Sequence, residues 1–84
     1  MLGPVGIDKS APQYVYRQIA EVIRGRIRSG ALPPRTRIPS LKDLEAEFDV
    51  SSMTVRRAIT ALAADGWVVT YPGRGTFVAD HPPE

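Results

Sequence analysis

The chain has 84 residues and a hydrophobic share of 43%, which suits one small packed domain and leaves no room for a second. It contains no cysteine, which excludes a disulfide framework, a thiol nucleophile and a cysteine-based zinc finger. No apolar run approaches a membrane span, residues 1–10 lack a signal pattern, and the formal net charge is +2, so we expect a cytoplasmic protein with no membrane partner.

The first predicted helix follows a segment without periodicity. Residues 1–11 contain glycine and proline at irregular spacing, so we expect a flexible N-terminal arm there. Pro12 stands where a helix can begin, and Gly30 is a natural stop. Between them, apolar residues recur at helical spacing and predict one buried stripe. The stripe consists of Val15, Ile19, Val22, Ile23 and Ile27.

The second predicted helix begins at Ser40. A rigid turn at residues 32–34 leads into residues 35–38, which are few enough to pair as a brief strand. Ser40 is followed three residues later by Asp43, which is the pattern of a capping box at a helix N-terminus. A turn is expected at residues 49–51, where Asp49 tolerates a left-handed backbone better than most residues do.

The third predicted helix is capped by Ser51 and ends at Asp65-Gly66. One side of this helix is apolar and is expected to face the core. That side carries Val55, Ala58, Ile59 and Leu62. The opposite side is expected to face solvent, and it carries Met53, Arg57 and Thr60, with Thr54 and Arg56 on its flanks.

A β-hairpin is predicted after the third helix. Residues 67–71 are rich in β-branched and aromatic side chains, residues 72–75 form a turn, and residues 76–78 return. We expect Trp67 and Phe77 to lie in the core, and residues 80–84 to form a flexible tail. The order of helix, short strand, helix, helix and hairpin predicts a small α+β domain, a winged helix-turn-helix, over residues 12–79.

A helix-turn-helix followed by a basic hairpin is an arrangement that reads double-stranded DNA. The start of the third helix offers hydroxyl and backbone N–H groups at Ser51, Ser52 and Thr54, which suit phosphates and bases. Met53 can contact a thymine methyl group, and Arg56 can reach a guanine edge or a phosphate. The third helix is therefore the candidate recognition helix.

Arg57 and the hairpin tip complete the candidate DNA-binding residues. Arg57 lies on the exposed side, where it either binds phosphate or is solvated. Gly73 and Gly75 let the backbone approach closely, and Arg74 between them can enter a narrow minor groove. Each feature also has a purely structural alternative: a plain N-cap at Ser51, a surface ion pair at Arg56 and a bare turn at residues 72–75.

These residues together resemble the winged-helix DNA-binding domain of the GntR family of bacterial transcriptional regulators. The resemblance runs from about residue 12 to residue 78. It rests on Tyr14, Gly30-Ala31-Leu32-Pro33-Pro34, Arg37-Ile38-Pro39-Ser40, Val50-Ser51, Thr54-Val55-Arg56 and Gly73-Arg74-Gly75-Thr76-Phe77-Val78. By this resemblance, Lys42 is a DNA-contacting residue of the second helix. The resemblance also implies recognition-helix contacts by Ser51, Ser52, Met53, Thr54 and Arg56, and a minor-groove contact by Gly73.

The sequence departs from the family pattern in two positions and in its length. Ser52 stands where an arginine is common, and Leu41 stands where an acid is common, so the DNA sequence that is read stays open. Family members usually carry a C-terminal domain that binds a metabolite and often drives dimerisation. This sequence has no room for such an effector domain, and its ends favour a naturally short regulator over a truncated piece.

The function that we expect is sequence-specific transcriptional regulation by a repressor that binds a short inverted repeat as a homodimer. The alternative is a winged-helix interaction module, or a DNA-binding subunit that relies on a separate effector protein. An enzyme is not expected, because His81 is the only histidine and lies in a proline-rich tail without a nucleophile or paired carboxylates. No metal or cofactor motif occurs, so we expect no cofactor.

Overall fold

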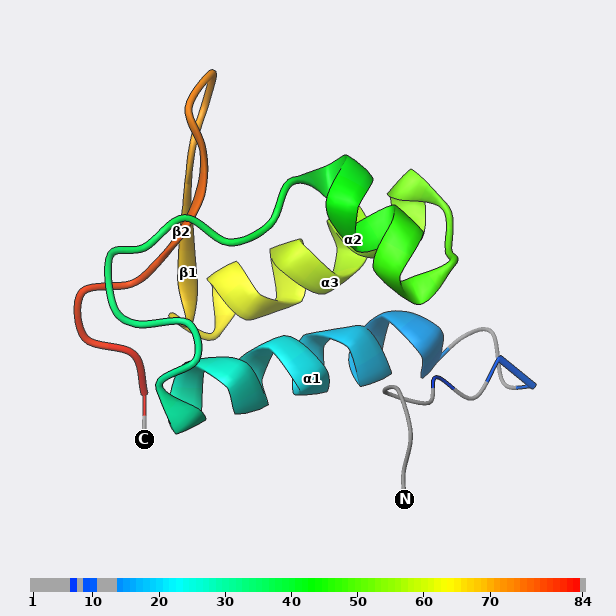
Figure 1. The fold of residues 1–84 in the computed structure, drawn as a ribbon, viewed down its shortest axis with the longest axis horizontal. Helices are drawn as coiled ribbons and strands as arrows, with labels where there is room; N and C mark the ends of the chain where they lie inside the picture. Colours follow the sequence, from blue (N-terminus) through cyan, green and yellow to red (C-terminus); the bar gives the residue numbers. More distant parts are fainter. Residues whose placement is uncertain (1–6, 8, 11–13, 84) are drawn as a thin grey trace.

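The computed structural model describes residues 7, 9, 10 and 14–83. α1 (Val15–Ser29) runs along one side of the molecule, and α2 (Leu41–Phe48) and α3 (Ser52–Ala64) pack on it (Figure 1). β1 (Val68–Tyr71) and β2 (Gly75–Val78) form an antiparallel hairpin that projects away from the helices. This order confirms the predicted α+β winged helix-turn-helix; the hairpin and its turn are the wing.

α1 ends where the sequence predicts, whereas its predicted start lies outside the described residues. Pro12 and most of the predicted N-terminal arm lie outside the described residues. Within the arm, Ile7 packs partly buried against the core, and Lys9 Nζ donates a hydrogen bond to the carbonyl oxygen of Asp49 at 2.5 Å. α1 ends as predicted at Gly30, whose φ of 88° is left-handed. Among the described helices, none combines the length and apolarity needed to cross a membrane.

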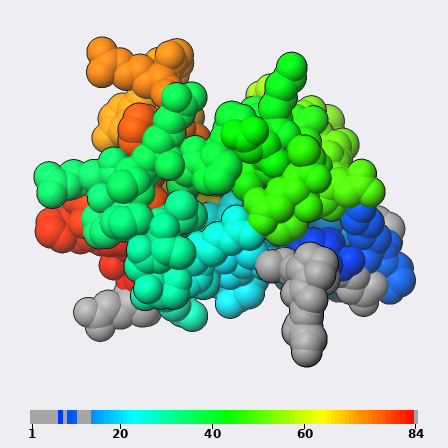
Figure 2. Space-filling view, viewed as in Figure 1, coloured from blue at the N-terminus to red at the C-terminus, as the bar shows by residue number. Residues whose placement is uncertain are grey.

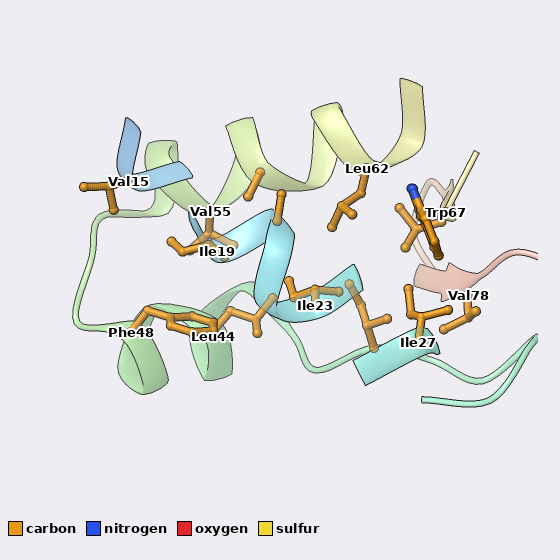
Figure 3. Close-up of a cluster of buried hydrophobic side chains, with 14 residues drawn as sticks. Val15, Ile19, Ile23, Ile27, Leu44, Phe48, Val55, Leu62, Trp67 and Val78 are labelled. Atoms are coloured by element: carbon orange, nitrogen blue, oxygen red, sulfur yellow. The ribbon is translucent and has the colours of Figure 1, made fainter. Parts of the chain in front are cut away.

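The core lies between α1 and α3 and is closed by α2 and the base of the wing (Figure 3). Each helix buries one apolar stripe, and the stripe predicted for α1 is buried except at Val22, which lies at its edge. The core consists of Val15, Ile19, Ala20, Ile23, Ile27, Ile38, Leu44, Phe48, Val55, Ala58, Leu62, Trp67, Val68 and Val78. Because α3 buries only this stripe, its other side is left to solvent.

Trp67 closes the core beside the C-terminal end of α1 (Figure 3). Its side chain is buried, and the guanidinium groups of Arg24 and Arg28 lie 5.8 and 5.5 Å from the centroid of its ring. Its backbone N–H donates to the carbonyl oxygen of Leu62 at 2.9 Å, and its carbonyl oxygen accepts from Ala79 at 3.0 Å. These bonds fix the base of the wing on the end of α3.

α2 and α3 begin at the caps that the sequence predicts, and the turn between them has the predicted left-handed residue. Ser40 and Asp43 form a complete capping box, with the Asp43 N–H donating to Ser40 Oγ at 3.1 Å. Asp49 takes the left-handed conformation, with φ 54°. Ser51 Oγ then accepts from the N–H of Thr54 at 3.3 Å and caps α3. The bounds of the two helices therefore follow from short-range contacts.

The brief strand predicted at residues 35–38 is reduced to an isolated bridge between Arg37 and Phe77. Arg35 has a left-handed φ of 67°, and Pro39 has no N–H, so the extended backbone cannot continue in either direction. The segment still joins β2, because Ile38 donates to the carbonyl oxygen of Thr76 at 2.9 Å. The wing is thereby tied to the residues that precede α2.

Phe77 lies outside the core, and this corrects the prediction that it is buried there. Neighbouring strand residues face opposite sides of a sheet, and Val78 occupies the inward position with 2% exposure. Phe77 therefore points to the outer face of the wing, where its ring meets Tyr71 edge to face at 5.8 Å. Ile59, also predicted to be buried, packs partly buried at the margin of the core.

Candidate nucleic-acid interface

The solvent-facing side of α3 carries the residues that the sequence singles out. Val55, Ala58 and Leu62 are buried against α1 and α2, so helical geometry turns the residues between them outward. Met53 lies among these outward residues, with an exposed fraction of 70%. The exposed face of α3 consists of Ser52, Met53, Arg56, Arg57 and Thr60.

Ser51 and Thr54 are committed to the start of the helix. Besides accepting from the Thr54 N–H, Ser51 Oγ lies 3.1 Å from Thr54 Oγ1. The structural role considered for Ser51, an N-cap, is therefore present. Ser52 is the first residue of α3 and is exposed. A contact of Ser51, Ser52 or Thr54 with DNA stays a prediction.

A hollow separates the wing from the start of α2 and from α3. The part between wing and α2 has a volume of about 250 Å³ and the part against α3 about 320 Å³; Leu41, Ile59, Thr70 and Thr76 line both. We call the two parts together the wing-side hollow. Figure 2 shows the wing in orange and α2 in green, standing on the same side of the molecule with a gap between them. Arg56 and Thr60 border this hollow from α3, and Lys42 follows Leu41 at the exposed start of α2.

The wing tip brings two of its three predicted residues into this hollow. Gly73 and Gly75 line it, with positive φ angles of 78° and 120°. The turn is closed by a hydrogen bond from the Arg74 N–H to the carbonyl oxygen of Tyr71 at 2.9 Å. Arg74 is exposed and borders the outer face of the wing beside Phe77, so it does not share the hollow with the glycines.

Arg37 is a cation of the wing-side hollow that the sequence prediction did not include. Its guanidinium lies on the backbone of Gly75, so closely that a Cβ atom there would stand 2.6 Å from Arg37 Nε. Gly75 is thus a packing position for Arg37, and its contact with DNA remains a prediction. The signal that could have identified Arg37 is the brief strand before Pro39, because pairing it with the wing places Arg37 there.

The ion pairs of the described residues divide the cations into two groups. Four pairs join Lys9 to Asp49, Arg24 to Glu21, Arg26 to Glu47 and Arg35 to Asp80. The hydrogen bonds that Arg26 donates to Glu47 raise the pKa of Arg26. The side chain of Asp43 is engaged in the capping box. Within the described part of the chain, no such pair engages Arg17, Arg28, Arg37, Lys42, Arg56, Arg57 or Arg74. Apart from Arg28, these unpaired cations lie around the exposed face of α3, in α2 and in the wing. The surface formed by these three elements is therefore positively charged.

Arg57 is held by an aromatic ring. Its guanidinium lies 4.5 Å from the centroid of Tyr16, which belongs to the first turn of α1. Tyr16, Met53, Arg56, Arg57 and Thr60 line a further hollow of about 370 Å³ between α3 and α1, the α1-side hollow. The exposed face of α3 therefore stands as a ridge between two hollows.

The described residues contain no group of three histidine, cysteine or acidic side chains placed to hold a metal ion. His81 is exposed in the segment that follows β2. The arrangement on this side of the molecule, an exposed helix face with cations on both flanks, suits contact with a polyanion.

The sequence matches a family model described as bacterial regulatory proteins, gntR family, over residues 15–78. It is 37% identical over 75 residues to the HTH-type transcriptional repressor NagR of Bacillus subtilis, and 41% identical over 69 residues to the histidine utilization repressor of Pseudomonas aeruginosa. These matches cover 89% and 82% of this chain and 31% and 28% of the relatives. The chain thus spans about three tenths of the length of these relatives.

Solved structures share the fold. YtrA from Sulfolobus acidocaldarius, a GntR-family transcription factor, is similar with a TM-score of 0.81 and 29% identity, over 94% of this chain and 83% of that chain. A crystal structure of AraR(DBD) in complex with an operator is similar with a TM-score of 0.76 and 37% identity, over 94% of each chain.

Proposed function

The chain belongs to the gntR family of bacterial regulatory proteins, and from this membership we propose that it is a sequence-specific DNA-binding repressor. The observation that carries the proposal is the exposed face of α3, with its unpaired arginines and the exposed Met53. The similarity to AraR(DBD), which was solved with an operator, supports DNA as the partner.

In this proposal α3 enters the major groove. The groove is about 12 Å wide and accepts an α-helix whose first turns reach the base edges. Ser51, Ser52 and Thr54 lie nearest the bases and phosphates, and Met53 contacts a thymine methyl group. Arg56 donates two hydrogen bonds to a guanine, because it is free of an ion pair among the described residues and borders both hollows.

The wing takes the adjoining minor groove. Arg74 at the exposed tip enters it, and Gly73 and Gly75 let the backbone come close. Lys42, at the exposed start of α2, binds a phosphate between the two grooves. Two copies of the chain bind one site, since an inverted repeat matches a two-fold protein pair.

A fluorescence-anisotropy titration tests the proposal directly. Labelled duplex from upstream of the protein's own gene is compared with a scrambled duplex at two salt concentrations. We expect binding of the first duplex to be tighter by a factor of about 10³ or more, with two protein chains per site. Equal and strongly salt-dependent binding of both duplexes would contradict sequence-specific reading by this chain. Binding of neither duplex would favour the alternative, an interaction module that acts with a separate effector protein.

A further inference from the structure

Tyr16 stands at the side of α3 that faces away from the wing. α1 and α3 lie side by side, and Tyr16 lines the α1-side hollow together with Met53, Arg56 and Thr60. Arg56 and Thr60 also line the wing-side hollow. A helix in the major groove has a row of phosphates on each side, and the wing and α2 account for one row only. The α1-side hollow therefore faces the second row when α3 is placed in the groove.

Two arginines meet on the Tyr16 side chain. The Arg57 guanidinium lies 4.5 Å from the centroid of the ring, and Arg17 Nε donates a hydrogen bond to Tyr16 Oη at 3.2 Å. Arg17 also lies 5.6 Å from the centroid of Tyr14. A stacked guanidinium keeps its N–H edges free, so these contacts orient both cations without using all of their donors.

The hydroxyl of Tyr16 is set to act as a donor. Its oxygen accepts from Arg17, so its own O–H group can point outward. The hydrogen bond and positive charge of Arg17, followed by the charge of Arg57, lower the pKa of Tyr16. A phenol with a lowered pKa is a stronger hydrogen-bond donor toward an anion.

The acids that lie near this group form no ion pair with its arginines. Neither α1 nor α3 has an acid in its first turn, and Arg17 and Arg57 belong to none of the four ion pairs of the described residues. Glu21 and Asp65 line one hollow with Tyr16 and Arg17. Glu21 pairs with Arg24 at 2.8 Å, and Asp65 follows the C-terminal end of α3.

We propose that Tyr16, Arg17 and Arg57 form a phosphate clamp that grips the DNA backbone on the side of α3 opposite the wing. This inference rests on the DNA-binding function proposed above. It adds two residues of α1 to the interface and assigns to Arg57 the phosphate contact that the sequence left open against plain solvation. The clamp positions the recognition helix and contributes equally on every DNA sequence.

The salt dependence of binding tests the clamp with the matched pair Arg17→Gln and Arg28→Gln. Both arginines lie on α1 and both lie against an aromatic ring, but Arg28 lies against Trp67, away from the clamp. We expect Arg17→Gln and Arg57→Gln each to reduce the slope of log K against log[salt] by about 0.9, the value for one phosphate contact. Tyr16→Phe keeps the ring and should weaken binding to specific and scrambled duplexes by a similar factor. Arg28→Gln should leave both quantities unchanged.

A second measurement replaces single phosphates of the duplex by uncharged methylphosphonates. One or two neutral positions on the groove edge opposite the wing should weaken the wild-type protein and leave the Arg17→Gln, Arg57→Gln double variant unaffected. An unchanged salt slope in folded Arg17→Gln and Arg57→Gln variants, with specific binding of the wild type intact, overturns the clamp and leaves the proposed function standing. Failure of the wild type to bind any duplex overturns both.

Discussion

Arg56 and Arg57 are neighbours in the sequence with different surroundings. Arg56 is exposed and borders the hollows on both sides of α3, whereas Arg57 is placed over Tyr16 at 4.5 Å. An arginine that is not stacked can adjust to a base edge, while a stacked arginine presents its N–H groups in one direction. We therefore assign the base to Arg56 and the phosphate to Arg57.

Arg56→Ala should reduce specific binding by about 1–3 kcal/mol and relax the preference at one base pair, because a bidentate contact to guanine is lost. Competition titrations with duplexes that carry single base changes measure both effects. Arg57→Ala is the matched control and should weaken all duplexes alike. If Arg56→Ala also weakens specific and scrambled duplexes by the same factor, Arg56 contacts the backbone and reads no base.

Among the single elements, α3 depends for its start on Ser51, the N-cap residue that precedes it. Ser51 Oγ accepts from the Thr54 N–H, whereas Ser52 is exposed at the next position. Ser51→Ala should therefore lower the free energy of unfolding by about 1 kcal/mol, and Ser52→Ala should leave it within about 0.5 kcal/mol of the wild type. Urea denaturation followed by circular dichroism compares the two variants. Equal stability of both would exclude the cap as a significant contribution.

The wing contains two glycines with different constraints. A methyl group at Gly75 would meet Arg37 Nε at 2.6 Å in a backbone with φ 120°, while Gly73 has φ 78° and open space around it. Gly75→Ala should cost about 1–3 kcal/mol of stability and more than Gly73→Ala. Adding Arg37→Ala to Gly75→Ala should restore part of the loss, which a double-mutant cycle measures. Strict additivity of the two changes would show that the contact with Arg37 is not limiting.

These elements show that the sequence predicts local hydrogen bonds and does not predict contacts between distant segments. The sequence predicts caps at Ser40 and Ser51 because a cap bonds to a residue three positions further on, and this spacing is visible in the sequence. The position of Arg37 on Gly75 and of Tyr16 under Arg57 depends on tertiary packing between distant segments. The prediction that Phe77 is buried is wrong because the face of a short strand follows from its register, which composition alone does not fix.

At the scale of the whole molecule, one small core supports every part of the proposed interface. Ile19 is fully buried at the contact of α1 with α3, so Ile19→Ala should cost about 2–5 kcal/mol. That is a large share of the roughly 5–15 kcal/mol that stabilises a typical domain. Phe77→Ala, on the outer face of the wing, should cost less although it removes a larger side chain. Thermal unfolding of both variants, followed by circular dichroism, compares the two losses of stability. A larger loss for Phe77→Ala than for Ile19→Ala would show that Phe77 belongs to the core.

The setting of Trp67 gives the protein a built-in optical reporter. It is the only tryptophan of the chain, it is buried between the base of the wing and α1, and it lines neither the wing-side nor the α1-side hollow. Its emission spectrum should move to longer wavelength when the hydrophobic centre opens to water and stay constant while a nucleic acid occupies the opposite flank of α3. Its emission therefore reports loss of the folded state alone, and a dye on the duplex can report occupation of the ligand surface as a separate signal in the same cuvette.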